Sequence, residues 1–362
     1  MRQASTNVRG LPTSHILTVK MIEGSQSPQG FLDSLKSANR DAFPSRPVGE
    51  EYLRLHLEEL ASLGIEGVNP EAWFDGQLAT MLDRIAGTLS PNAQALLKAR
   101  VAVGTAELAS ANAWIIRSAD GGVYAILIHR GLLSLMNHYV KLTAAAQDPA
   151  AVSFFEGHSA PVLPSATYTR VASIMLRRYA ESGEVHGPEL KFRSDSTTRL
   201  LVDGRLLMTH LFVLAHEVGH YVNGDLEADG HFSASTRMNG AEVFGVNVSH
   251  AMEFAADRFA FEAVLRLWFA SDPSTAATIA LYSSATLLFN VLREIGNSGS
   301  LSHPRPSDRL LAIVQSFFGP EAALLLAKSF DDLSYVASFG DHVGDRSVAD
   351  LLCDRANPGS HT

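Results

Sequence analysis

Apolar side chains recur with helical spacing most regularly between Leu206 and Gly224, in the stretch LLMTHLFVLAHEVGHYVNG. A period of about 3.6 residues predicts a helix, and the pair Asn223-Gly224 is a typical signal for its end. Three ionisable residues stand within five positions of this apolar run, and such groups are costly to bury unless they are paired or bound to a metal. They are His216, Glu217 and His220.

The same periodicity predicts a mostly helical protein. Ser90-Pro91 is a typical helix start, and Asp308 is a candidate N-cap for a helix that begins near Arg309. The run from Ala276 to Leu292 is the most apolar, but polar residues keep it short of the roughly 18 to 20 residues of a membrane span, so we expect a buried helix. Other helices are expected over residues 50–63, 71–86, 91–103, 166–180 and 250–270, from 131 onward, and twice within 310–338.

Two short runs rich in β-branched and aromatic residues have the composition of strands and not the spacing of helices. Asn112–Arg117 and Val123–His129 are separated by a loop that ends in two glycines, which predicts a β-hairpin. A strand at the edge of a sheet can hold an extended peptide through backbone hydrogen bonds. The hairpin, and Val123–His129 in particular, is therefore a candidate substrate edge. The alternative is a hairpin of the core.

These elements indicate an α+β protein that is predominantly helical, with a small antiparallel sheet or hairpin beside the helix of the two histidines. We expect an irregular arm and a helical region over residues 1–105, because four prolines punctuate the first fifty residues. The main domain is expected over residues 106–340, and a polar tail over residues 341–362.

His216 and His220 are four positions apart, which places both imidazoles on one face of a helix. They can share a metal ion, and Glu217 then stands beside the open position of the ion rather than on it. Zinc held by two histidines and a third protein ligand keeps a site for water and lowers the pKa of that water toward about 7. A nearby carboxylate can take its proton, which is the chemistry of a zinc hydrolase.

A third ligand is expected on the following helix. Glu253 and Asp257 are again four positions apart, so one carboxylate can bind the ion while the other orients a histidine. Glu253 lies 253 − 220 = 33 residues after His220, which leaves room for a loop and a returning helix. The surrounding apolar residues argue against an exposed charged stripe and favour Glu253 as the ligand. The alternatives are Asp225, His231, Glu242 and His250, of which His250 is the strongest.

Composition and charge narrow the possible partners. The net charge of −9 is spread along the chain, and no basic cluster indicates a nucleic-acid surface. Cys353 is the only cysteine, which excludes an intramolecular disulfide framework and is typical of a reducing compartment. The N-terminal residues lack the apolar core of a secretory signal. We therefore expect a cytoplasmic protein without nucleic-acid partners and without membrane association.

The metal motifs resemble those of a known group of peptidases. The segment HEVGH, followed by Glu253-Phe254-Ala255-Ala256-Asp257, is similar to the motifs of the gluzincin peptidases of the HtpX and CAAX-prenyl-protease family. Asn112-Ala113-Trp114 and the segment Ser302-His303-Pro304 with Arg309 resemble two further segments of that family. Its members are often integral membrane proteins, whereas this sequence contains no convincing span, so the chain is expected to be a soluble relative. A host-directed peptidase of the phage-exclusion type with the same motif is a second possibility.

The resemblance implies a zincin-like metallopeptidase fold for the main domain. His303 and Arg309 would lie near the site, where either could polarise the scissile carbonyl or stabilise the oxyanion, or could merely tie their loop to the helices. The remaining roles implied are zinc ligands at His216, His220 and Glu253, a general base at Glu217 and an orienting carboxylate at Asp257.

The sequence therefore predicts a zinc-dependent endopeptidase in which Glu217 activates a zinc-bound water for attack on a peptide bond. Its partner would be a protein or peptide substrate. Two alternatives stay open, namely a non-catalytic, zinc-stabilised peptide-binding protein and a metal-dependent hydrolase of a non-peptide substrate. Glu217 argues against the first, because a closed structural zinc site has no use for a base.

Overall fold

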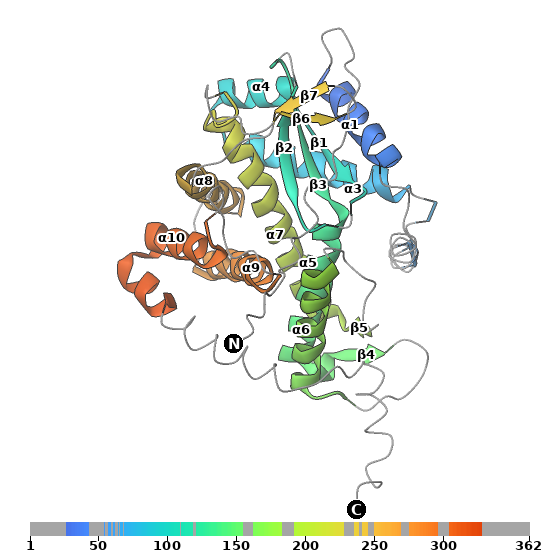
Figure 1. Cartoon of the computed structure of the whole chain (residues 1–362). Coiled ribbons are helices and arrows are strands. Elements are labelled where there is room, and N and C mark those ends of the chain that lie inside the picture. The colour runs from blue at the N-terminus through green and yellow to red at the C-terminus, as the bar shows by residue number, and fades with distance from the viewer. Residues whose placement is uncertain are drawn as a thin grey trace, which may run out of the picture.

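The computed structural model describes residues 27–42, 69–108, 110–118, 121–154, 162–182, 192–227, 235–238, 241–244, 250–268, 275–295 and 304–327, with single positions between 54 and 67. Most of these residues are helical, and a small mixed sheet lies at one end of the molecule (Figure 1). The expected α+β class with a predominance of helix is confirmed. His303, the tail at 341–362 and most of the helix expected at 50–63 lie outside the described residues.

The sheet has the strand order β1-β3-β2-β7-β6. β2 and β3 form the expected antiparallel hairpin. β1 runs parallel to β3, so the sheet is mixed and not antiparallel throughout as expected. β7 joins β2 through a single residue pair, Arg117 with Phe244. The strands are β1 Val101–Ala106, β2 Ala113–Arg117, β3 Tyr124–His129, β6 Ser235–Met238 and β7 Ala241–Phe244.

β1 occupies residues that we expected to end a helix. That helix, α4, spans Pro91–Arg100 and begins at Ser90 as predicted, but it stops before Val101. All six residues of β1 are buried. A strand buried on both faces is a continuous apolar run, so periodicity did not distinguish it from the end of a helix. β1 also spans the expected boundary between residues 105 and 106, and the division into domains stays a prediction.

β3 lies inside the sheet, between β1 and β2, and each of its residues is buried. The prediction that Val123–His129 is a substrate edge is therefore wrong, because backbone groups on both sides of this strand already pair with neighbours. Within the described residues, β2 pairs along its length with β3 and meets β7 at Arg117.

Side chains of the sheet alternate between two cores, as expected for a pleated strand covered on both faces. Ile126 and Ile128 of β3 belong to the larger core, and Leu127 belongs to the smaller one. The smaller core is closed by α1, Pro28–Ala42, which replaces part of the irregular arm that we expected. Its buried apolar residues are Phe31, Leu32 and Leu35.

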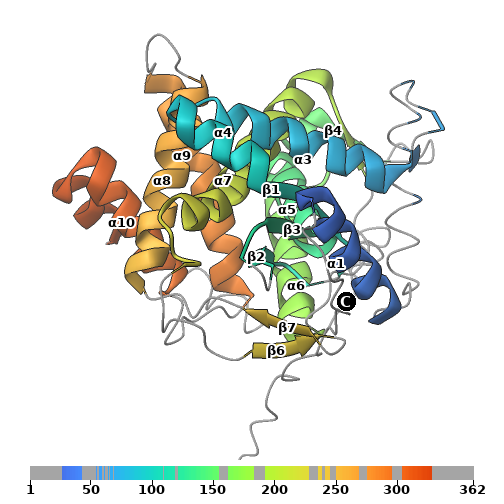
Figure 2. The ribbon, with the colours of Figure 1, turned by 90° about the horizontal axis from the view of Figure 1, so that it is seen from above.

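The larger core lies on the other face of the sheet. Figure 2 shows α1 on one side of the strands and α7 on the other. α7 spans Ser196–Val222 and begins at Asp195, whose side chain accepts a hydrogen bond from the Thr198 N–H, so it starts ten residues earlier than its apolar pattern indicated. The helices that share this core with α7 include α3 Pro70–Ala86, α5 Arg130–Gln147 and α6 Ser165–Ser182, all of which were expected.

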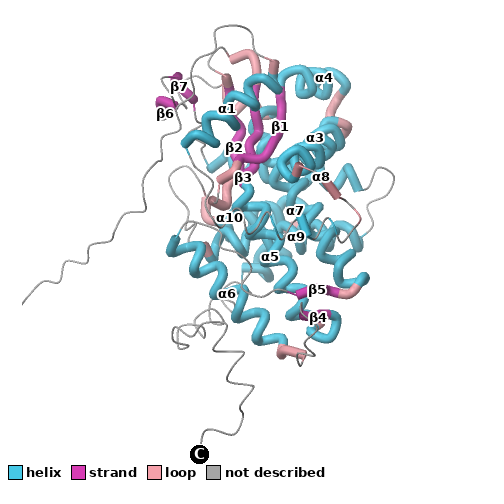
Figure 3. The backbone as a smooth tube through the Cα atoms, turned by 90° about the vertical axis from the view of Figure 1, so that its right-hand side faces the viewer, coloured by secondary structure: helices cyan, strands magenta, loops and turns pink. Residues whose placement is uncertain are grey.

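α8 and α9 pack against α7, and α10 packs against both. Figure 3 shows the three long strands at one end of the molecule and most of α5, α6 and α9 at the other. α10 has Arg305 at its N-cap and Pro306 as its first residue, so the prediction that Asp308 is the cap is wrong. These helices are α8 His250–Trp268, α9 Thr275–Glu294 and α10 Pro306–Phe318.

The short elements between α5 and α7 are a 3-10 turn at Pro149–Ala151 and a two-stranded sheet of β4, Val152–Phe154, and β5, Phe192–Ser194. The apolar run at Ala276–Leu292 forms α9 as expected, and it contributes Leu281 and Phe289 to the larger core. None of the helices in the described ranges combines the length and apolarity that a membrane crossing requires.

Candidate metal centre

α7 presents three ionisable residues to α8 in a buried position. His216, Glu217 and His220 expose only 8%, 7% and 4% of their surfaces. Gly219 lies between them, and a Cβ at this position would be 3.0 Å from the Cα of Ala256. The absence of a side chain therefore lets α8 approach closely enough for its carboxylates to reach the histidines.

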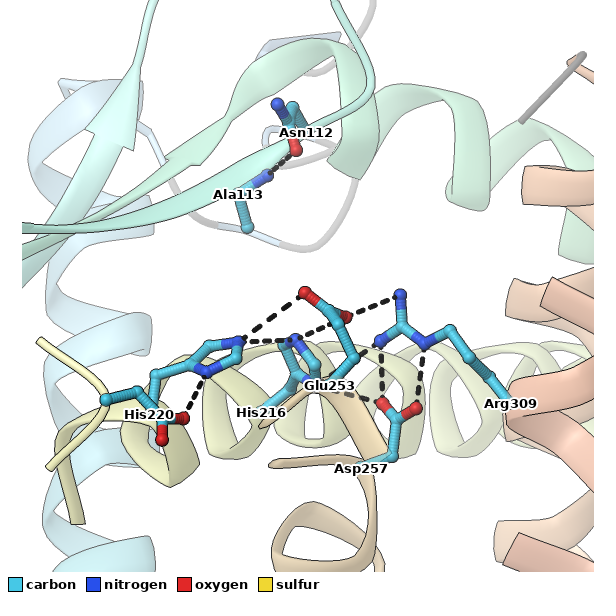
Figure 4. Close-up of polar contacts among 8 residues, drawn as sticks. Asn112, Ala113, His216, His220, Glu253, Asp257 and Arg309 are labelled. Carbon is cyan, nitrogen blue, oxygen red and sulfur yellow. Dashed lines mark hydrogen bonds and ion pairs between the residues drawn. The ribbon is translucent and has the colours of Figure 1, made fainter. Parts of the chain in front are cut away.

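α8 contributes Glu253 and Asp257, which are one helical turn apart and almost completely buried. Figure 4 shows the carboxylate of Glu253 beside the two imidazoles. Its Oε2 is 3.5 Å from Nε2 of His216, and its Oε1 is 3.8 Å from Nε2 of His220. The two Nε2 atoms are 3.1 Å apart.

These three residues form a group that could hold a metal ion. One donor atom from each of His216, His220 and Glu253 lies within 4.8 Å of the others. Ligands about 2.0–2.2 Å from a tetrahedral ion are about 3.3 Å from one another. The two Nε2 atoms are 3.1 Å apart, and the two oxygens of Glu253 are 3.5 and 3.8 Å from them, which is close to that value. Two imidazole nitrogens and one carboxylate oxygen fit a divalent ion such as zinc, with a fourth position left open.

Asp257 and Arg309 form a buried pair beside this group. Asp257 Oδ1 is 2.9 Å from Nδ1 of His216, which leaves Nε2 of that ring directed toward Glu253. Arg309, from α10, donates to both oxygens of Asp257 at 2.7 and 2.6 Å, and its Nη1 is 3.1 Å from Oε2 of Glu253. One guanidinium thus ties the two carboxylates of α8 to α10 (Figure 4).

The pKa values of these groups follow from burial and from opposite charges. Burial would lower the pKa of His220, but its bond with Asp225 and the nearby carboxylates raise it above the ordinary value. Burial would raise the pKa of Asp257, but Arg309 and His216 hold it below the ordinary value. The pKa of Arg309 is raised, because Asp257 and Glu253 outweigh its burial. A metal ion therefore competes with a proton at His220.

Asp225 is the partner of His220. Its Oδ2 is 2.8 Å from Nδ1 of that ring, and its side chain is buried. We expected Asp225 only as a possible ligand, and its orienting contact was missed. The sequence feature that could have indicated this contact is Gly224, since a glycine after a helix turns the next residue back over the last helical turn.

Among the other candidates, His250 stands apart from the group. His250 is exposed at the start of α8 and is not part of the metal-binding group. His231, His303 and the side chain of Glu242 lie outside the described part of the structure. Arg309 lies beside Glu253, as the resemblance implied.

Comparison with known families adds an independent finding to this geometry. The family model described as Peptidase U49 matches residues 134–329, more than half of the chain, and this range includes the helices of the metal-binding group. The protein is therefore a peptidase, whose reaction is the hydrolysis of peptide bonds and whose substrate is a peptide or protein. The chain belongs to the peptidase U49 family. No curated protein and no solved structure matches it. The more specific resemblance to the HtpX and CAAX-prenyl-protease family stays a prediction.

Proposed function

We propose that this peptidase is a zinc-dependent endopeptidase with a zincin-like site. The observation that carries the proposal is the buried group of His216, His220 and Glu253, with Glu217 next in sequence to His216, in a member of a peptidase family. A structural metal site is usually closed by four protein ligands and needs no neighbouring base. The buried carboxylate of Glu217 beside a three-ligand group therefore favours catalysis.

The residues of the site have separate roles in the proposed reaction. When bound, zinc supplies Lewis acidity, which polarises a peptide carbonyl and makes a water molecule acidic. Glu217 accepts the proton of the attacking water and later delivers it to the leaving amine. His216, His220 and Glu253 hold the ion, and Asp257 keeps Nδ1 of His216 turned away from it.

We propose that the edge of β2 that faces away from β3 is the binding strand for the substrate. His129 N–H donates to Asn112 O at 3.0 Å, so alternate residues of β2 from Asn112 onward face β3. Ala113 and Ile115 therefore direct their backbone groups to the opposite side. The Ala113 N–H donates to Asn112 Oδ1 at 2.9 Å. Among the described residues, the Ile115 N–H and the carbonyls of Ala113 and Ile115 have no strand partner on this side, and we propose that they bind an extended peptide. Figure 4 shows Asn112 and Ala113 on the strand across from the metal-binding group, with Ala113 the nearer of the two.

Arg309 is better suited to positioning than to stabilising an oxyanion. Its guanidinium contacts Asp257 and Glu253 at 2.6 to 3.1 Å, and a donor engaged in this way is not directed at a substrate. We therefore propose that it holds the two carboxylates of α8, which was the alternative role considered for it. A catalytic role for His303 stays a prediction.

The replacement Glu217→Gln tests the proposal. It keeps the size of the side chain and removes the base, so we expect hydrolysis of an unfolded protein substrate to fall by roughly 10²–10⁴-fold. Zinc content measured by elemental analysis should stay at that of the wild type. Glu181→Gln, on an exposed part of α6, is the control and should keep full activity.

A Glu217→Gln protein with wild-type turnover would contradict the assignment of the base. A wild-type protein that hydrolyses peptides at the same rate with and without a strong chelator, and contains no metal, would contradict the metallopeptidase class itself.

A further inference from the structure

The turn that ends α7 has a defined geometry. Gly224 has φ +73°, a left-handed conformation that favours glycine. Its N–H donates to Tyr221 O at 3.2 Å, and the N–H of Asp225 donates to His220 O at 3.0 Å. This pair of bonds is the Schellman motif of helix C-termini, which turns the residue after the glycine back over the last helical turn.

The residue that this turn brings back is Asp225. In Schellman motifs an apolar residue at this position frequently packs against the helix. Here a carboxylate with 7% exposure lies 2.8 Å from Nδ1 of His220. A buried carboxylate is costly unless it is bonded, so a polar residue at this position requires a polar partner. That bond leaves Nε2 of His220 directed toward His216 and Glu253.

The β2–β3 hairpin holds the turn in place. Arg117, from the end of β2, donates through Nη1 to the carbonyl of Leu226 at 3.1 Å. Tyr124, from the start of β3, donates through its hydroxyl to Oε1 of Glu227 at 2.8 Å. Leu226 itself is 1% exposed. The position of Asp225 is therefore set by the turn that precedes it and by the contacts of the two residues that follow it.

We propose that Asp225 is a second positioning carboxylate of the metal centre, which orients His220 as Asp257 orients His216. A carboxylate on the second nitrogen of a metal-bound imidazole fixes its tautomer, aims the ring and raises its basicity. The turn at Gly224-Asp225 is then part of the metal centre. The inference rests on the proposed metal site and adds a residue that holds no ion itself.

Zinc affinity measured directly, without any activity assay, tests this role. Purified apoprotein variants compete with a chromophoric chelator for Zn²⁺ alone, and thermal unfolding of each apoprotein is recorded in parallel. We expect Asp225→Ala to lose 10–100-fold in zinc affinity, the range typical for such partners. Asp225→Asn should lose less, because its amide oxygen can still accept the Nδ1–H bond. Asp203→Asn, exposed on the same helix, is the matched control and should bind as the wild type does.

The possible outcomes are distinct. Wild-type zinc affinity in folded Asp225→Ala would overturn the inference, as would a lower melting temperature of the apoprotein without a loss of affinity. If Asp225→Ala does not fold, Asp225→Asn decides, and unchanged affinity there overturns the inference. A wild-type protein that binds no zinc would overturn the proposed metal site, and the inference with it.

Discussion

The guanidinium of Arg309 is the cation of a buried cluster of charges. It reaches Asp257 and Glu253 from another helix, and all three side chains are nearly buried. Breaking a buried ion pair is costly, because the remaining charge keeps its desolvation penalty and loses its compensation. The stability of the region around α8 and α10 should therefore depend on this one residue.

We expect Arg309→Met to lower the free energy of unfolding by about 3–5 kcal/mol, measured by urea denaturation of the apoprotein. The matched control is Arg266→Met, which removes an arginine from an exposed pair with Glu262 on α8. Exposed pairs contribute about 0–1 kcal/mol, so the control should change little. Equal effects of the two replacements would show that the Arg309 cluster does not stabilise the fold.

His129 is a second buried ionisable residue with a measurable effect on stability. It is 0% exposed, its Nδ1 bonds with Ser110 Oγ at 2.7 Å, and burial lowers its pKa from 6.5 to about 3. Below pH 6.5 the unfolded chain binds a proton at this residue and the folded chain does not. Acid therefore favours unfolding until the folded pKa is reached.

For this one residue the free energy of unfolding should fall by about 1.4 kcal/mol for each pH unit between 6 and 4. His129→Gln cannot titrate, so its stability should decline less steeply than that of the wild type by that amount. Denaturant titrations at several pH values measure both slopes, and parallel curves for the two proteins would rule out this contribution of His129.

α7 contains two glycines with different surroundings, and only Gly219 lies at the contact with α8. Ala normally stabilises a helix interior by about 1 kcal/mol over Gly. At Gly204 nothing lies within 4 Å of a new Cβ, so the ordinary gain applies. At Gly219 the Cβ would be 3.0 Å from the Cα of Ala256, a backbone atom that cannot move without the rest of α8.

We therefore expect opposite signs for two identical replacements. Gly204→Ala should raise the free energy of unfolding by about 1 kcal/mol. Gly219→Ala should lower it by about 1–3 kcal/mol and weaken zinc binding, because α8 carries Glu253. Chemical denaturation and chelator competition measure both, and a stabilised Gly219→Ala protein with wild-type zinc affinity would refute the close contact.

Elements with a local pattern could be predicted from the sequence. The apolar run of α7 and the two runs of the hairpin indicate their structures directly, and the spacing of His216 with His220 and of Glu253 with Asp257 indicates shared helix faces. The first ten residues of α7 were missed. Leu200 and Leu201 lie on the exposed side of the helix, at 74% and 45% exposure, so apolar residues there do not follow the helical period. β1 was missed because burial on both faces removes the alternation of a strand.

Contacts between distant residues set the rest of the site, and no local pattern contains them. Arg309 bonds with Asp257 across 52 positions of the chain, and only the family resemblance suggested that the two segments meet. Asp225 contacts His220 five positions earlier in the chain, and this contact depends on the left-handed conformation of Gly224, which no periodic pattern indicates.

The whole molecule is built around a sheet with two covered faces. α1 closes one face, and the larger core with α7 lies behind the other, so β3 is fixed from both sides. The hairpin of β2 and β3 also contacts the turn after α7 through Arg117 and Tyr124. The sheet and the metal-binding group are therefore parts of one packed unit.

The family match covers only part of this packed unit, because it begins after the three long strands. Residues 134–329 include α7, α8 and α10, which carry the side chains around the metal-binding group, whereas β1, β2 and β3 precede them. Substitutions along the proposed substrate edge of β2 would change which peptides are accepted and would leave the proposed ligands intact. If the proposed edge binds substrate, target choice and chemistry would evolve separately, so that a lineage acquires new targets while it inherits one reaction.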